Sequence, residues 1–247
     1  MSSSRYPGKV LEPLSGMPMI AFMVDRVRRA RRIDDVIVVT SVDSSDDPLA
    51  AILAERRIPS FRGDLNDVLA RYACAARTHD SDIVVRLTGD CPLIDPEIID
   101  RIIDLLDSTG SDYASNVDPP SYADGLDVEA FTRATLERAD REASSLAERE
   151  HVTLWMRSEQ AGLRRACLTS LVDSSHLRLT VDYPDDLAVV RRLVNALGDA
   201  PAHGDHYDML RCIDRDRSLL DLNRHARNEG LTISLEEPRG DDAALAD

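Results

Sequence analysis

Lysine is almost absent from this chain of 247 residues, and aromatic residues are scarce. Lys9 is the only lysine, so arginine supplies all the others among the 30 Lys and Arg residues. Phe, Trp and Tyr make up 4% of the chain, which predicts a core built mainly from Leu, Val, Ile and Ala. No apolar run approaches the ~20 residues of a membrane-spanning helix, and no signal peptide opens the sequence. We therefore expect no membrane insertion.

Positive charge and paired cysteines are lacking too. The 45 Asp and Glu residues give a formal net charge of −15, which argues against nucleic acid as a partner because a polyanion is repelled. The four cysteines, at 74, 91, 167 and 212, are widely spaced and form no CxxC pair. This spacing indicates neither a zinc site nor a disulfide framework, and it suits a reduced cytoplasm, where we expect the protein to act.

The first nine residues combine hydroxyl, cationic and turn-forming side chains. Ser3 and Ser4 precede Arg5, a Pro-Gly turn follows, and Lys9 stands four residues after Arg5. Gly8 lets the backbone approach a ligand closely, and N–H groups in such a loop can converge on an anion. Lysine binds phosphate as a point charge. The pattern predicts a phosphate-binding loop; the alternative is a disordered basic terminus.

Apolar runs and helical periodicities alternate through the first half of the chain. We expect strands at 36–40, 58–61 and 83–87, and helices at 19–32, 49–57, 67–76 and 96–107. This alternation predicts an α/β fold with a mostly parallel sheet and flanking helices. In such folds ligands bind at the carboxyl ends of the strands.

The second half of the chain mixes shorter elements. We expect strands at 112–116, 126–131, 167–171 and 176–182, and helices at 132–142, at 147–158, from 184 and within 206–227. Residues 1–235 are assigned to one domain. Residues 236–247 are acidic and interrupted by proline and glycine, and we expect a disordered tail there.

Two aspartates directly follow predicted strands in different parts of the chain. Asp90 comes after the run 83–87, and Asp182 ends the run 176–182. Two carboxylates that converge from strand ends suit Mg²⁺, which takes one or two protein carboxylates together with substrate phosphates. Each aspartate alone is equally well explained as a turn or helix cap. Together with the lysine-bearing loop, they predict a magnesium-assisted phosphate site.

Further carboxylates lie in the second half. Asp127 and Glu129 are two residues apart in an alternating run, so on a strand they would face the same side and could orient sugar hydroxyls. The alternative is a solvated strand edge. Glu150 and His151 belong to an acidic helix start, for which charge favoured by the helix dipole is the simpler explanation.

Seven stretches, in order, carry a resemblance to a known family. They are SSRYPGKVL (3–11), FRGDLNDVLARY (61–72), VRLTGDCPLIDP (85–96), DGLDVE (124–129), EREHVT (148–153), LTVDYPDDL (179–187) and RNEG (227–230). The chain resembles the nucleotide-sugar cytidylyltransferases, and most closely the spore coat polysaccharide biosynthesis branch, whose relatives include acylneuraminate and deoxy-octulosonate cytidylyltransferases. The resemblance implies a glycosyltransferase-A-like fold. It also implies transfer of CMP from CTP to an acidic or modified sugar with release of pyrophosphate, for surface polysaccharide or glycan synthesis.

The resemblance also implies roles for individual residues. The catalytic residues would be Arg5, Lys9 and Asp90. The nucleotide would be bound by Ser3, Ser4, Arg5, Gly8, Lys9, Arg86, Thr88 and Gly89. The sugar would be bound by Asp127, Glu129, Glu150 and His151, and Mg²⁺ by Asp90 and Asp182. The implied partners are CTP and a sugar acid, and a homodimer is expected because relatives are often dimers.

The chain departs from the family at its start. Relatives carry a β-strand before the phosphate loop, whereas Met1 stands where that strand would end. We expect the first strand of the sheet to be missing from this sequence, through a start codon assigned too late. Two alternatives stay open: a glycosyltransferase that uses a nucleotide-sugar donor, and a catalytically inactive, N-terminally truncated homologue.

Overall fold

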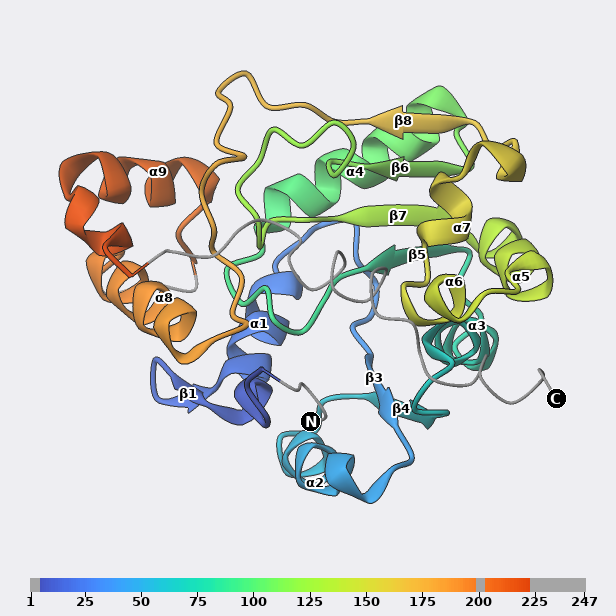
Figure 1. Cartoon of the computed structure of the whole chain (residues 1–247), viewed down its shortest axis with the longest axis horizontal. Coiled ribbons are helices and arrows are strands. Elements are labelled where there is room, and N and C mark those ends of the chain that lie inside the picture. The colour runs from blue at the N-terminus through green and yellow to red at the C-terminus, as the bar shows by residue number, and fades with distance from the viewer. Residues whose placement is uncertain (1–4, 199–202, 223–247) are drawn as a thin grey trace, which may run out of the picture.

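The computed structural model describes residues 5–198 and 203–222, and it confirms an α/β fold (Figure 1). Ser3, Ser4 and the acidic tail predicted at 236–247 lie outside these residues. The disorder of that tail and the extent of the domain to residue 235 therefore stay predictions. Among the helices in the described ranges, none combines the length and the apolarity that a membrane crossing needs.

The first half of the described chain alternates short strands with helices. In order, its elements are η1 (Lys9–Leu11), β1 (Pro13–Leu14), β2 (Met17–Pro18), α1 (Met19–Val27), β3 (Val38–Ser41), η2 (Ser44–Asp46), α2 (Asp47–Glu55), β4 (Ser60–Gly63), α3 (Val68–Thr78), β5 (Ile83–Arg86) and α4 (Pro96–Thr109). The three strands predicted in this half are confirmed, with small shifts at their ends.

The second half contains shorter elements. In order, they are β6 (Tyr113–Ser115), β7 (Glu129–Thr132), α5 (Arg133–Glu142), α6 (Leu146–Glu150), α7 (Leu154–Arg157), η3 (Glu159–Ala161), β8 (Arg165–Cys167), α8 (Pro184–Ala196), α9 (His206–Arg215) and η5 (Arg217–Leu220). The helix predicted over 147–158 is divided into α6 and α7, because Val152 takes a left-handed conformation with φ of 52° between them. The strand predicted over 176–182 is wrong: this segment forms a single β-bridge, between Arg178 and Asp124.

Local sequence signals explain where the main helices begin and end. Asp67 and Asp95 each accept a hydrogen bond from a first-turn N–H, at the starts of α3 and α4. Pro96 occupies the first turn of α4, where its missing N–H costs nothing, and Gly110 ends that helix in the left-handed conformation.

The strands pair in a mixed rather than a mostly parallel arrangement. β3 is parallel to β4, and a separate four-stranded sheet has the order β5-β7-β6-β8. β7 is antiparallel to both β5 and β6, whereas β6 and β8 are parallel. The expectation of a mostly parallel sheet is corrected here because the chain returns from β6 to the adjacent β7 without a crossover helix, a connection that gives antiparallel pairing. The main apolar core joins α1, α4 and α8.

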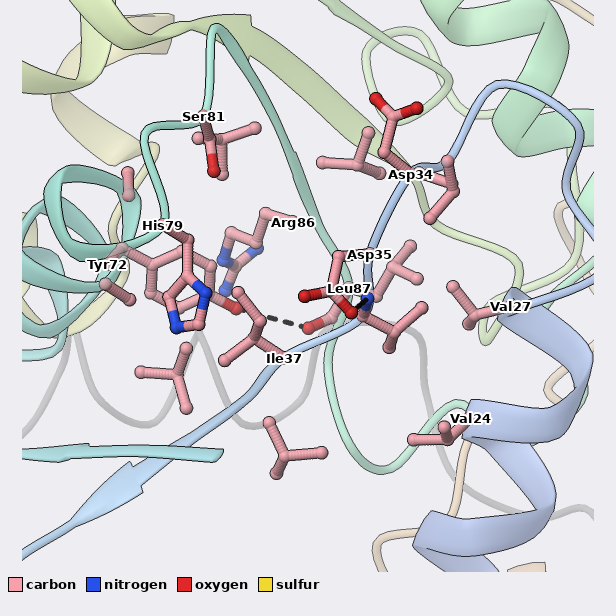
Figure 2. A pocket seen from close by; sticks show the side chains of 18 of the residues that line it. Val24, Val27, Asp34, Asp35, Ile37, Tyr72, His79, Ser81, Arg86 and Leu87 are labelled. Atoms are coloured by element: carbon pink, nitrogen blue, oxygen red, sulfur yellow. Dashed lines mark hydrogen bonds between the residues drawn. The ribbon is translucent and has the colours of Figure 1, made fainter. Parts of the chain in front are cut away.

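A cavity of about 980 Å³, lined by apolar side chains together with charged ones such as Asp35 and Arg86, lies between β3 and β5, which belong to different sheets (Figure 2). Side chains from α1, α3 and both strand segments line it, among them Val24, Tyr72, Ile37 and Leu87. β5 is only half-buried along its length, although an interior strand of an α/β sheet is buried on both faces. Within the described residues β5 pairs only with β7, so the cavity lies along the other edge of β5.

Candidate functional site

The loop before η1 turns through a glycine in a conformation that other residues avoid. Gly8 has φ of 75°, in the left-handed region. Across this turn the N–H of Lys9 donates to the carbonyl of Tyr6 at 3.3 Å, and the N–H of Leu11 donates to the carbonyl of Gly8 at 2.9 Å. The turn directs the Lys9 side chain inward, so that the residue is only 8% exposed. The described part of the predicted loop, from Arg5 onward, is therefore an ordered turn and not a basic terminus in solvent.

Asp90 and Asp182 meet beyond the carboxyl end of β5. Asp90 follows that strand, and the segment that carries Asp182 runs beside Asp90. The N–H of Val181 donates to the Asp90 carbonyl at 2.8 Å, and the Thr180 hydroxyl donates to the same carbonyl at 3.2 Å. Backbone hydrogen bonding thus brings together two carboxylates that lie far apart in the sequence.

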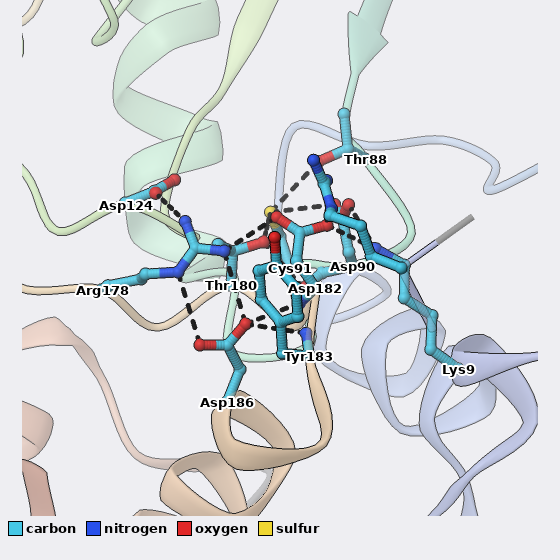
Figure 3. A network of polar contacts seen from close by, with 11 residues as sticks. Lys9, Thr88, Asp90, Cys91, Asp124, Arg178, Thr180, Asp182, Tyr183 and Asp186 are labelled. Atoms are coloured by element: carbon cyan, nitrogen blue, oxygen red, sulfur yellow. Dashed lines mark hydrogen bonds and ion pairs between the residues drawn. The ribbon is translucent and has the colours of Figure 1, made fainter. Parts of the chain in front are cut away.

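Lys9 bridges these two carboxylates (Figure 3). Its Nζ lies 2.9 Å from Asp90 Oδ2 and 2.8 Å from Asp182 Oδ1. Arg5 Nη2 donates to the same Asp182 Oδ1 at 2.7 Å, and the Arg5 guanidinium lies 5.7 Å from the ring centroid of Tyr183. The residues predicted for phosphate and for metal therefore form one cluster. We call Arg5, Lys9, Asp90 and Asp182 the Lys9 cluster.

The charges of the Lys9 cluster keep one another ionised. Burial lowers the pKa of Lys9, but Asp90 and Asp182 outweigh it and raise that pKa above its ordinary value. Burial raises the pKa of Asp182, yet Lys9, Arg178 and Arg5 bring it well below the ordinary value. The pKa of Asp90 is also lowered, because Lys9 outweighs burial and the neighbouring Asp182. At neutral pH, Lys9 is an ammonium and both aspartates are carboxylates.

A buried arginine holds Asp182 from the other side (Figure 3). Arg178 is 4% exposed, and it donates to Asp182 Oδ2 at 2.8 Å and to Asp124 Oδ2 at 2.9 Å. Asp186 Oδ2 lies 3.3 Å from Arg178 Nη2 and accepts the N–H of Asp182 at 2.8 Å. Asp182 therefore presents Oδ1 to Lys9 while Arg178 holds its Oδ2.

Sequence reasoning missed Arg178 and Asp186 and gave Asp124 no role. Arg178, Thr180 and Asp182 alternate with apolar residues, and alternate residues of an extended segment project from one face. This alternation was the signal that linked the arginine with the predicted metal ligand. Asp186 carries a weaker signal, since an acidic residue in the first turn of a helix is also explained by capping.

The two aspartates fit the protein's share of a Mg²⁺ ligand set. Their oxygens converge on one point, because both lie within hydrogen-bond distance of the single Lys9 Nζ. Together with Arg178 and its partners, the cluster contains four carboxylates and three cations, which leaves one negative charge in excess. Within residues 5–198 and 203–222, no group of three or more His, Cys, Asp or Glu side chains is arranged to hold a metal ion. The remaining ligands would be water and phosphate oxygens, as is usual for Mg²⁺.

Thr88, Gly89 and Asp127 lie near this cluster. A Cβ on Gly89 would lie 3.6 and 3.7 Å from side chains of η1 and α1, so this residue packs directly against the loop that carries Lys9. The Thr88 hydroxyl contacts Cys91 Sγ at 3.1 Å. Burial raises the pKa of the Cys91 thiol well above its ordinary value, and Asp90 and Asp127 add to this. Cys91 is therefore an inert packing residue.

Arg86 and Glu129 contact one another. They are cross-strand partners in β5 and β7 and form an ion pair, and the Tyr113 hydroxyl donates to Glu129 Oε1 at 2.6 Å. Burial raises the pKa of Glu129, but Arg86 brings it below the ordinary value. Asp127 precedes β7, so the prediction that it lies on the same strand as Glu129 is wrong. The proposed contacts of Arg86 with the nucleotide and of both carboxylates with the sugar stay predictions.

Glu150 and His151 lie at the carboxyl end of α6. α6 is beside α3 and α5 at one end of the molecule, whereas α1 and α8, next to the Lys9 cluster, are at the other (Figure 1). These two residues therefore lie apart from the cluster, and their contact with a sugar stays a prediction.

The fold and the site together define a class of protein. A solved structure of a cytidylyltransferase from Leptospira borgpetersenii superposes on this chain with a TM-score of 0.85 at 31% identity. The superposition covers 92% of this chain and 94% of that one. The chain has the nucleotide-diphospho-sugar transferase fold, and it is a nucleotidyltransferase.

The chain belongs to the cytidylyltransferase family, whose model matches residues 1–189 and so includes the whole Lys9 cluster. The spore coat polysaccharide biosynthesis protein SpsF of Bacillus subtilis is 31% identical over 207 residues, which are 81% of this chain and 85% of that protein. A 3-deoxy-manno-octulosonate cytidylyltransferase of Anaeromyxobacter is 42% identical over 105 residues, and this match spans 41% of each protein. The family resemblance inferred from the seven motifs is confirmed.

Proposed function

We propose that this protein transfers CMP from CTP to a hydroxyl of an acidic or modified sugar, with release of pyrophosphate, for the synthesis of a surface polysaccharide or glycan. The observation that carries the proposal is the Lys9 cluster, in which two cations suited to a triphosphate meet two carboxylates suited to Mg²⁺. The names of two relatives support the substrate class, since one is named for 3-deoxy-manno-octulosonate and the other for spore coat polysaccharide.

In this reaction the sugar hydroxyl attacks the α-phosphorus of CTP, and the bond from that phosphorus to the pyrophosphate oxygen breaks. Arg5 and Lys9 hold the triphosphate and stabilise the negative charge that develops on its oxygens. Asp90 and Asp182 would hold Mg²⁺, which supplies charge neutralisation and alignment of the phosphates. The reaction needs no protein nucleophile, in keeping with the inert surroundings of Cys91.

Pyrophosphate release tests the proposal. The protein is incubated with CTP, Mg²⁺ and a panel of sugar acids that includes 3-deoxy-manno-octulosonate, with ATP, GTP and UTP as matched nucleotide controls. We expect release that requires both CTP and one of the acids. In a parallel incubation with a nucleotide sugar in place of CTP, turnover without pyrophosphate release would support a glycosyltransferase instead. No turnover of either kind would support a catalytically inactive homologue.

A further inference from the structure

The Lys9 ammonium occupies the point on which the two predicted metal ligands converge. It lies within 2.9 Å of an oxygen of Asp90 and within 2.8 Å of an oxygen of Asp182, and its side chain is almost fully buried. An oxygen that pairs with this ammonium is not available to a second cation at the same place. Lys9 and a metal ion therefore compete for the same two oxygens.

We propose that Lys9 is a built-in counter-ion, which holds the two carboxylates while no nucleotide is bound and moves to the triphosphate when a nucleotide arrives. The inference rests on the proposed function, because it takes a nucleoside triphosphate as the second partner of Lys9. It goes further in assigning Lys9 two alternative positions. Its consequence is that Asp90 and Asp182 become free for a metal ion only when a triphosphate draws away both Lys9 and Arg5, which donates to the same Asp182 Oδ1.

The electrostatics of the cluster favour such an exchange. Two carboxylates this close repel one another unless a cation lies between them. If Lys9 were displaced without a triphosphate, a buried ammonium would lose both of its partners, and an unpaired buried charge is strongly unfavourable. A triphosphate gives the ammonium new anionic partners and removes that cost. Binding of the metal and of the nucleotide is therefore cooperative, and the cooperativity is reciprocal.

The other contacts of the cluster let Lys9 leave without disturbing Asp182. Arg178 donates to Asp182 Oδ2 at 2.8 Å, and Asp186 accepts the backbone N–H of Asp182 at 2.8 Å. Both contacts lie on the side away from Lys9 (Figure 3). Lysine also suits the exchange better than arginine, because its ammonium is a compact charge on a flexible stem, whereas a guanidinium is a rigid fork.

Lys9 can be observed alone in the unmodified protein, because it is the only lysine of the chain. Protein labelled with ¹⁵N and ¹³C in lysine gives one set of side-chain NMR signals. We expect these signals to stay in place when Mg²⁺ is added alone and to shift when CTP and Mg²⁺ are added together. Equal shifts with Mg²⁺ alone, or unchanged signals in protein that calorimetry shows to have bound CTP and Mg²⁺, would overturn the proposal.

Substitution of Lys9 gives a second readout. In Lys9→Met the competitor is gone, and we expect nucleotide-free binding of Mn²⁺, followed by electron paramagnetic resonance, to be roughly tenfold tighter or more than in the wild type. Lys9→Arg keeps the charge and should bind Mn²⁺ as weakly as the wild type. Affinity of Lys9→Met equal to or below that of the wild type contradicts the exchange. If Lys9→Met does not fold, the NMR measurement on the wild type decides alone.

A matched control variant removes another cation that contacts two aspartates, outside the Lys9 cluster. Arg32 also contacts two aspartates, Asp104 at 3.4 Å and Asp107, on the exposed surface of α4. Arg32→Met should leave nucleotide-free Mn²⁺ binding unchanged, and a gain equal to that of Lys9→Met would show a general effect of charge. The Mn²⁺ measurements need neither sugar nor turnover. The Mn²⁺ result therefore remains valid even if the pyrophosphate assay detects no turnover. Conversely, an active enzyme whose Lys9→Met variant binds Mn²⁺ no more tightly would refute this inference and leave the proposed function intact.

Discussion

Asp182 links the cations at the start of the chain with the buried Arg178. Its Oδ1 accepts hydrogen bonds from Arg5 and Lys9, which come from the start of the chain, and its Oδ2 accepts one from Arg178. The sequence alone predicted Asp182 as a metal ligand and Lys9 as a phosphate ligand. It did not show that the two side chains pair, because an ion pair between distant residues depends on tertiary structure and no local pattern records it.

The acid sensitivity of the protein should change when Asp182 is replaced by asparagine. The folded-state pKa of Asp182 lies below that of an unfolded aspartate, about 3.9, so the carboxylate stabilises the fold above that pH. This contribution is lost as the pH falls through the folded-state pKa. We therefore expect Asp182→Asn to lower the unfolding temperature most at pH 7 and progressively less below about pH 4.

Thermal unfolding at pH 7, 5, 4 and 3 checks this expectation. Asp25 is exposed on α1, so Asp25→Asn serves as the control and should produce a small difference at every pH. A deficit of Asp182→Asn that stays constant from pH 7 to pH 3 would show that the carboxylate does not stabilise the fold through its charge.

Arg178 should act as a positioning residue for Asp182. Arg178→Lys keeps one charge but loses the fork that contacts Asp124, Asp182 and Asp186 together. We expect the Mg²⁺ concentration needed for half-maximal pyrophosphate release to rise about tenfold, with a smaller change in the rate at saturating Mg²⁺. A titration with Mg²⁺ measures both quantities. A fall in the rate alone, with unchanged Mg²⁺ dependence, would argue against positioning.

At the scale of elements, the sequence predicted well the helices and strands that depend on neighbouring residues, and it predicted poorly those that depend on tertiary contacts. The helix starts at Asp67 and Pro96 and the strand in β5 follow from caps and apolar runs that act over a few residues. The segment 176–182 has the alternation of a strand, yet it forms one bridge and is otherwise held by hydrogen bonds to the Asp90 carbonyl and by the charges around Arg178. Alternation reports one buried face, and it does not report whether a neighbouring strand is there to pair.

The close approach of the 124–129 segment to the segment 178–182 depends on Gly125. It has φ of 105°, and a Cβ there would lie 2.6 Å from the backbone of Leu179 and of Thr180. Gly125→Ala should therefore destabilise the fold by about 2 kcal/mol or more and weaken CTP binding, because it displaces the segment that carries Asp182. Denaturant unfolding and calorimetry measure the two effects.

Gly162 offers the matched control for this substitution. It also has a positive φ, 59°, but no atom lies within 4 Å of the position of a Cβ. Gly162→Ala should cost only the backbone strain of about 1 kcal/mol and leave CTP binding unchanged. Equal effects of the two substitutions would mean that the contact with Leu179 is unimportant.

At the scale of the whole molecule, the divided sheet is the main feature. β3 and β5 face one another across the cavity, with Asp34 and Ser81 together on one side of it (Figure 2). Its lining also includes Val10 and Gly89, which follows the carboxyl end of β5. Val10 belongs to η1, so the described chain begins close to Gly89.

An added apolar strand should therefore stabilise the protein. The test is an extension of five residues, Val and Ile in alternation, joined ahead of Met1. As a strand it would span about 16 Å at ~3.3 Å per residue, which is the length of β5 together with Leu87. Each buried Val or Ile contributes up to ~1.5–3 kcal/mol, and ordering of the added chain opposes about half of this or more. With a net gain of about 2 kcal/mol, the unfolding temperature should rise by roughly 5 °C.

The control is an extension of equal length made of Ser and Asp, which cannot replace water favourably against the apolar part of the lining. Differential scanning calorimetry of both extended proteins, together with binding of a hydrophobic dye, separates filling of the cavity from a general effect of added residues. The apolar extension should raise the unfolding temperature and reduce dye binding, and the polar one should change neither. If both extensions behave alike, the cavity between β3 and β5 is not a strand site, and the two sheets are stable apart as they stand.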